Sequence, residues 1–224
     1  MKQFKKIVEN ISDDIISFIY PPICISCEKL QPIGTESAKR SICDNCFSNF
    51  LGGSFCDESK AHACNYDGVV QECVYKLKYG KREYAARGLG FVMANSIDRD
   101  FFVGADFIVP VPIHKNRYKS RGFNQAELLS IYLCRNLNID NLKRPTNILK
   151  RVKDTRPMAE LDPSLRKISI SNAFDLNRKI DIINKTIIIV DDIYTTGSTL
   201  DECKSVLYNH GAAKVKYATL SVVS

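Results

Sequence analysis

One segment of the chain changes from apolar to polar within a few residues, and it predicts a strand, a loop and a helix in succession. The apolar run from Thr186 to Val190 is rich in β-branched residues, as buried strands are. Two adjacent acids follow, Asp191 and Asp192, and then a short stretch of hydroxyl residues and glycine at 195–199. Apolar residues with helical spacing resume after this stretch, so we expect a helix to begin there.

This order of elements is typical of a sugar-phosphate site. Parallel sheets bind ligands at the carboxyl ends of their strands, where helix N-termini present free N–H groups to phosphate. Asp191 and Asp192 are suited to hydrogen bonds with ribose hydroxyls, and Gly197 lets the backbone approach a phosphate closely. The predicted phosphate loop consists of Thr195, Thr196, Gly197, Ser198 and Thr199.

Two other interpretations of the segment remain open. An apolar run that ends in two acids is also found in the Walker B strand of ATPases, but the chain has no Gly-x-x-x-x-Gly-Lys-Ser/Thr sequence to hold the nucleotide phosphates. Alternatively, the segment is a core strand whose polar end is only a turn and a helix cap.

Apolar spacing elsewhere predicts the rest of an α/β fold. A turn and a helix are expected between Tyr66 and Gly80, with Lys76 and Lys78 on the polar side of the helix. Further helices are expected over residues 82–94 and 124–137. Strands are expected over 107–112, where prolines end the strand, and over 215–223, which should complete the sheet.

A basic stretch follows the 107–112 strand and suits a pyrophosphate group, because densely placed cations favour a multiply charged anion. The alternative is an exposed basic turn. The predicted pyrophosphate loop consists of Val111, Pro112, Lys115, Arg117, Lys119 and Arg121.

The polar segment 149–157 has little periodicity. It is interpreted as a flap, with Arg151 and Thr155, that closes over a bound anion; a plain surface hairpin fits the same residues.

The nine cysteines of the chain are concentrated near its start. Two Cys-x-x-Cys pairs stand fifteen residues apart, which is the spacing of a structural zinc site with four thiolate ligands. Disulfides are the alternative, disfavoured in a cytoplasmic protein. The predicted zinc ligands are Cys24, Cys27, Cys43 and Cys46, whereas Cys56, His62 and Cys64 make only a weak case for a fragment of a second metal site.

Composition and charge limit the number of domains and the kinds of partner that the chain can have. At 224 residues with 45% hydrophobic residues, the chain suits one sizeable domain with a small appendage. The net charge of +7 favours anionic partners. No apolar run reaches the ~18 residues of a membrane span. We expect an amphipathic helix over 1–20, docked on the protein or contacting a membrane surface. A zinc ribbon is expected over 21–60 and an α/β domain over 61–224, in a protein of the cytoplasm.

The chain resembles the ComF (ComFC) family of bacterial phosphoribosyltransferase-like proteins, which are associated with natural transformation. The resemblance rests on the cysteine pairs, Arg121-Gly122-Phe123-Asn124-Gln125 and Val190-Asp191-Asp192 with its loop. It departs from the family at Met158 and Ser169, and in lacking a complete second set of cysteine pairs.

The resemblance implies a type I phosphoribosyltransferase-like fold, a mostly parallel sheet flanked by helices, with a small N-terminal zinc ribbon. It implies binding of phosphoribosyl pyrophosphate (PRPP) with Mg²⁺ by a protein that handles incoming single-stranded DNA, with a helicase or recombination factor as a partner. Either the protein transfers phosphoribose to an acceptor, with Asp191 and Asp192 as catalytic residues, or it is a binding module without turnover. No acceptor is identifiable from the sequence, and a purely structural metal-binding protein would leave the Thr-Thr-Gly loop unexplained.

Overall fold

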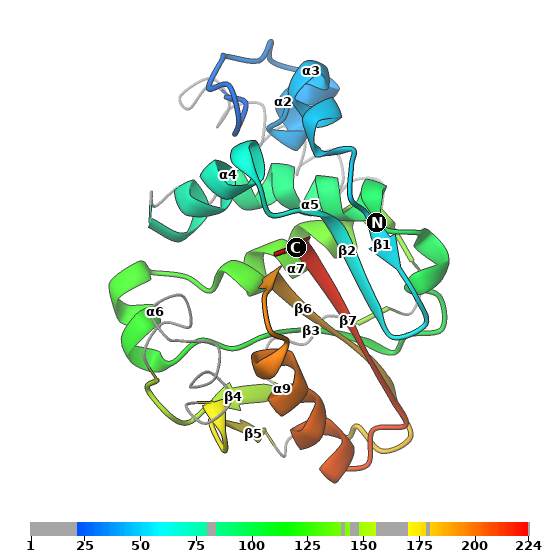
Figure 1. The fold of residues 1–224 in the computed structure, drawn as a ribbon. Helices are drawn as coiled ribbons and strands as arrows, with labels where there is room; N and C mark the ends of the chain where they lie inside the picture. The colour runs from blue at the N-terminus through cyan, green and yellow to red at the C-terminus, as the bar shows by residue number, and fades with distance from the viewer. Residues whose placement is uncertain are drawn as a thin grey trace, which may run out of the picture.

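A five-stranded sheet forms the centre of the protein. This computed structural model describes residues 22–79, 84–139, 142–143, 148–155, 170–177 and 180–223. The strand order is β1-β2-β7-β6-β3, and all neighbouring strands are parallel except β1 and β2 (Figure 1). The strands are β1 (Phe55–Cys56), β2 (Lys60–Asn65), β3 (Phe107–Pro110), β6 (Thr186–Tyr194) and β7 (Lys214–Val222).

Helices cover both faces of the sheet. One face carries α4 (Gly68–Tyr79), α5 (Ala85–Ser96) and α7 (Gln125–Leu137), and the other carries α9 (Ser198–Asn209) (Figure 1). A two-stranded antiparallel sheet, β4 (Leu149–Arg151) with β5 (Phe174–Leu176), packs on the α9 side. This arrangement confirms the predicted α/β fold with a mostly parallel sheet.

The side chains of β6 alternate between two hydrophobic cores, as the period of a strand requires. Ile188 and Val190 pack with α4, α5 and α7, whereas Ile187 and Ile189 pack with α9 and β5. All four are fully buried. Because both faces are covered, the continuous apolar run in the sequence is explained.

The cysteine-bearing segment lies beyond α4 and α5. It contains α2 (Glu36–Arg40), α3 (Asp44–Phe47) and the 3₁₀ turn η1 (Ser48–Phe50), drawn in blue in Figure 1. Ile25, Ile42 and Phe50 are fully buried and share the core of α4 and α5. The segment is therefore packed onto the α/β part of the protein.

Several predicted elements require correction. The predicted final strand is present as β7, but the strand β2, which pairs along the edge of β7 away from β6, was not predicted. The basic stretch after β3 is the helix α6 (Lys115–Arg121), capped by the side chain of His114, and not a loop. The predicted N-terminal helix over 1–20 lies outside the described residues. Among the helices that the structure describes, none is long and apolar enough to cross a membrane.

Candidate functional site

A cavity of about 830 Å³ opens at the carboxyl ends of β3 and β6. Its walls come from α4, one face of α6, the first turn of α9 and the end of β4. The position agrees with the general rule that open parallel sheets bind ligands at this edge. The cavity has the size of sites for ligands of a few hundred daltons.

Asp191 and Asp192 lie near the end of β6 and point to opposite faces of the strand. The Oδ2 atom of Asp192 lies 2.7 Å from Nζ of Lys78 on α4, and the side chain of Asp192 is 6% exposed. No hydrogen bond from the described residues supplements this ion pair at Oδ2. Burial, together with the neighbouring Asp192 carboxylate, raises the pKa of Asp191. The site thus holds two carboxylates, of which one is already neutralised by a lysine.

The predicted phosphate loop follows directly after β6, and all five of its residues line the cavity. Gly197 has φ 78°, in the left-handed region, and serves as the N-cap of α9. Its conformation turns the chain so that the first N–H groups of this 12-residue helix face the cavity edge. The hydroxyls of Thr196 and Ser198 lie 2.9 Å apart. The loop combines backbone donors and hydroxyls in one place.

The helix α6 separates the cations that the sequence placed together. Arg117 and Arg121, four residues apart on one face, line the cavity with Val111 and Pro112. Lys115 and Lys119 lie on another face, are exposed and do not line the cavity. The prediction that these residues form a loop is therefore wrong: they form a helix, and a helix presents only every third or fourth residue to one side.

The base of the predicted flap contacts the arginine cluster. Arg151, on β4, lines the cavity, and its Nη2 donates to Oγ1 of Thr155. Arg117 Nη2 donates to the carbonyl of the same threonine at 2.6 Å. The Nε of Arg151 is buried with no hydrogen-bond partner among the described residues, and burial lowers its pKa. Thr155 thus holds two arginines side by side at the cavity. The positions Met158 and Ser169, where the sequence departs from the family, lie outside the described residues.

The α4 wall of the cavity was not foreseen. Lys78, expected on the polar face of its helix, is instead 20% exposed and points to Asp192. Tyr75 and Tyr79 line the cavity beside it, 64% and 62% exposed, with ring centroids 5.0 Å apart. The positions 75, 78 and 79 share one helical face, so their spacing could have indicated a common surface but not what that surface contacts.

The four predicted zinc ligands converge. The Sγ atoms of Cys24, Cys27, Cys43 and Cys46 all lie within 4.8 Å of one another. Tetrahedral coordination at a Zn–S distance of about 2.3 Å places sulfurs roughly 3.8 Å apart, and Cys27 and Cys43 are 3.9 Å apart. All nine cysteines are free of disulfides. The donor set and its spacing fit a structural Zn²⁺.

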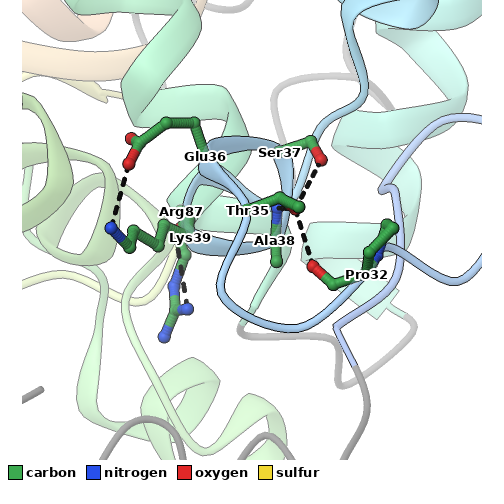
Figure 2. A network of polar contacts seen from close by, with 7 residues as sticks. All are labelled: Pro32, Thr35, Glu36, Ser37, Ala38, Lys39 and Arg87. Carbon is green, nitrogen blue, oxygen red and sulfur yellow. Dashed lines mark hydrogen bonds and ion pairs between the residues drawn. The ribbon is translucent and has the colours of Figure 1, made fainter.

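The short helix α2, between the two cysteine pairs, is held by local polar contacts (Figure 2). Thr35 caps it by accepting a hydrogen bond from the backbone N–H of Ala38 at 3.2 Å. Lys39 pairs with Glu36 at 2.9 Å, and Arg87 of α5 donates to the Lys39 carbonyl at 3.5 Å. These contacts stabilise α2 and attach it to α5.

The possible second metal site is not formed, because the ligand atoms of Cys56, His62 and Cys64 do not make a cluster among the described residues. His62 Nδ1 lies 2.6 Å from the Thr219 hydroxyl, and the Cys64 thiol contacts the Leu220 carbonyl. Cys56 is exposed on β1. In the part of the chain that the structure describes, the four-cysteine group is the one place where three or more cysteine, histidine or carboxylate ligand atoms come together.

Comparisons with known proteins agree with the fold. The family described as "Phosphoribosyl transferase domain" matches residues 120–221. Competence protein F of Haemophilus influenzae is 41% identical over 110 residues, which cover 49% of this chain and 47% of that protein. The DNA utilization protein YhgH of Escherichia coli K12 is 31% identical over 68% of this chain and 66% of its own length.

A longer match is found with Competence protein ComFC of Streptococcus pneumoniae, 24% identical over 88% of this chain and 86% of that protein. The chain spans about half the length of competence protein F and just under two thirds of the length of YhgH.

Proposed function

Because the chain belongs to the phosphoribosyltransferase-like family of the competence proteins F and ComFC and the DNA utilization protein YhgH, we propose that it binds PRPP together with Mg²⁺. The observation that carries the proposal is the cavity at the sheet edge. It brings two carboxylates, a hydroxyl-rich helix N-terminus and three arginines to one space of about 830 Å³.

Each part of the cavity suits one part of PRPP. The loop 195–199 and the N-terminus of α9 would bind the 5′-phosphate, because free N–H groups and the helix dipole favour an anion there. Asp191 and Asp192 would accept hydrogen bonds from the ribose hydroxyls. Both residues line the cavity, so each carboxylate can reach a sugar bound in it.

The pyrophosphate would lie against the arginine side of the cavity. Arg117, Arg121 and Arg151 offer planar donors suited to phosphate oxygens, and the Nε of Arg151 has no acceptor among the described residues. Mg²⁺, when bound with PRPP, supplies positive charge to the pyrophosphate oxygens; hard carboxylate donors such as the aspartate pair fit this ion. Lys115 and Lys119 do not line the cavity, so they would not contact the pyrophosphate.

Calorimetric titration of the full chain with PRPP, with and without Mg²⁺, tests this proposal. Asp191→Asn combined with Asp192→Asn should abolish binding. Asp106→Asn is the matched control, since Asp106 pairs with Lys185 at the opposite, amino end of β3 and β6. Wild-type affinity in the Asp191/Asp192 double variant, or loss of binding in the Asp106 variant alone, would refute the assignment.

A second function, handling of single-stranded DNA in transformation, is favoured by the surface near the cavity. Tyr75 and Tyr79 are exposed aromatic rings on which bases could stack, and Lys115 and Lys119 of the neighbouring helix are exposed cations. Lys39 of the cysteine segment is also exposed, whereas the neighbouring Arg40 is only 17% exposed and pairs with Asp44, so it is not available to a nucleic acid. This role would place the protein in the cytoplasm with a helicase or recombination factor.

Fluorescence anisotropy with a labelled oligonucleotide tests the DNA role. Affinity should fall steeply with salt, with a logarithmic slope of about −0.7 for each phosphate neutralised. Tyr75→Ala with Tyr79→Ala should weaken binding, whereas Tyr208→Ala, near the end of α9 that points away from the cavity, should not. Affinity independent of salt would contradict the role. Release of pyrophosphate from PRPP on addition of an acceptor would establish turnover in place of binding alone.

A further inference from the structure

Helix α4 touches both the cysteine cluster and the aspartate pair. Its residues Lys76 and Lys78 lie about 200° apart around the helix axis, so they project from opposite sides. Lys78 reaches Asp192 on the sheet side. Lys76 reaches the cysteine segment on the other side. A single rigid element therefore joins the two sites.

The contacts at the cysteine end involve the first Cys-x-x-Cys turn itself. Lys76 Nζ lies 3.4 Å from the carbonyl of Ile25 and 3.5 Å from that of Ser26, the two residues between Cys24 and Cys27. It also pairs with Glu28 at 2.9 Å. These groups are close only while the turn is folded, and ligation by four thiolates would stabilise that folded turn.

The first turn is also packed tightly against the rest of the protein. Ile25 is 1% exposed, and its carbonyl accepts a contact from the thiol of Cys73 on α4 at 3.6 Å. On α5, a Cβ atom at Gly88 would lie 2.9 Å from the Ile25 side chain. The turn therefore forms part of the surface against which α4 is seated.

The contact at the other end determines the state of Asp192. The Lys78–Asp192 pair is nearly closed to solvent, with the side chains 20% and 6% exposed, and Asp192 Oδ2 has no supplementary hydrogen bond from the described residues. A buried carboxylate without a counter-ion is strongly disfavoured, so removal of the lysine changes the position or charge of Asp192. Lys78 thus acts on a bound sugar through Asp192.

We propose that Lys78 is a positioning residue for Asp192, and that the zinc-bound cysteine turn sets its place through helix α4, so that PRPP affinity depends on an intact cysteine cluster. This inference rests on the proposed binding of PRPP. It assigns the cysteine segment a role in the sugar-phosphate site, although none of its residues lines the cavity.

The first test is calorimetry with PRPP and Mg²⁺ on the wild type, Lys78→Met, Lys78→Arg and Lys185→Met. Lys78→Met should weaken binding about tenfold or more, and Lys78→Arg should stay closer to the wild type because the charge is kept. Lys185→Met is the matched control: it removes a lysine–aspartate pair at the amino end of the sheet, with both side chains more exposed. Unchanged or tighter binding by Lys78→Met overturns the inference while the proposed function stands. Absence of binding by the wild type ends both.

The second test separates the link through α4 from a general loss of structure. Lys76→Met cuts the contacts to the cysteine turn and leaves all four thiolates in place, so zinc content, measured by release to a chromogenic chelator, should remain at one ion per chain. PRPP affinity should fall in the wild-type background but not further in the Lys78→Met background. Equal losses in both backgrounds would show that α4 does not connect the sites through Lys78.

Discussion

Replacement of Gly197 by alanine should damage the phosphate loop more than it damages the fold. Gly197 has φ 78°, and a left-handed conformation costs a non-glycine residue about 1–2 kcal/mol. A Cβ atom there would also lie 2.6 Å from the Tyr194 hydroxyl and 3.0 Å from its ring carbon, so the tyrosine must move. Because the tyrosine lines the same cavity, this movement disturbs the loop itself.

A matched variant isolates the local effect. Gly104 has φ 76°, and nothing lies within 4 Å of its Cβ position. Gly104→Ala should therefore lose the same ~1–2 kcal/mol of unfolding free energy in urea denaturation. Only Gly197→Ala should also weaken PRPP binding, by about tenfold, which corresponds to ~1.4 kcal/mol. If both variants bind PRPP like the wild type, the loop 195–199 does not hold the phosphate.

Three further outcomes are expected. The protein should contain one zinc ion per chain, and Cys27→Ser should lose it and lower the melting temperature, whereas Cys56→Ser, outside the cluster, should retain it. Burial and the Asp192 carboxylate raise the pKa of Asp191, so Asp191 should become protonated at a higher pH than a free aspartate. The affinity for PRPP at fixed Mg²⁺ should therefore fall as the pH falls. Calorimetry from pH 9 to about pH 6 measures this, and an affinity that does not change with pH would contradict it. Burial raises the pKa of Cys64 to about 12, so in the native protein iodoacetamide at about pH 8 should label the exposed Cys56 and leave Cys64 unmodified in peptide mass spectra, and the reverse order would be incompatible with the fold.

The parts of the protein that the sequence predicted well depend on local spacing. The run from Thr186 to Asp192 and its loop form a strand, a turn and a helix in register, because β-branched residues, glycine and hydroxyl residues each act on their own few neighbours. The two Cys-x-x-Cys pairs converge for the same reason. Helix α7 begins directly after the Asn124 cap, as its apolar spacing indicated.

The parts that could not be predicted depend on partners distant in the chain. Lys78 has the pattern of a surface lysine, and only the placement of α4 above the end of β6 brings it to Asp192. His62, between Cys56 and Cys64, could be a metal ligand by its sequence alone. In the fold, β2 pairs with β7, and this pairing places His62 beside the Thr219 hydroxyl. In the basic stretch, charge density indicated an anion site, but helix formation decided that Arg117 faces the cavity and Lys115 does not.

The most direct test of the account is a crystal structure of the full chain with PRPP and Mg²⁺. The 5′-phosphate should lie against residues 195–199, the ribose hydroxyls on Asp191 and Asp192, and the pyrophosphate toward Arg117 and Arg151. A ligand bound elsewhere on the protein, with this cavity free of density at saturating PRPP, would contradict it.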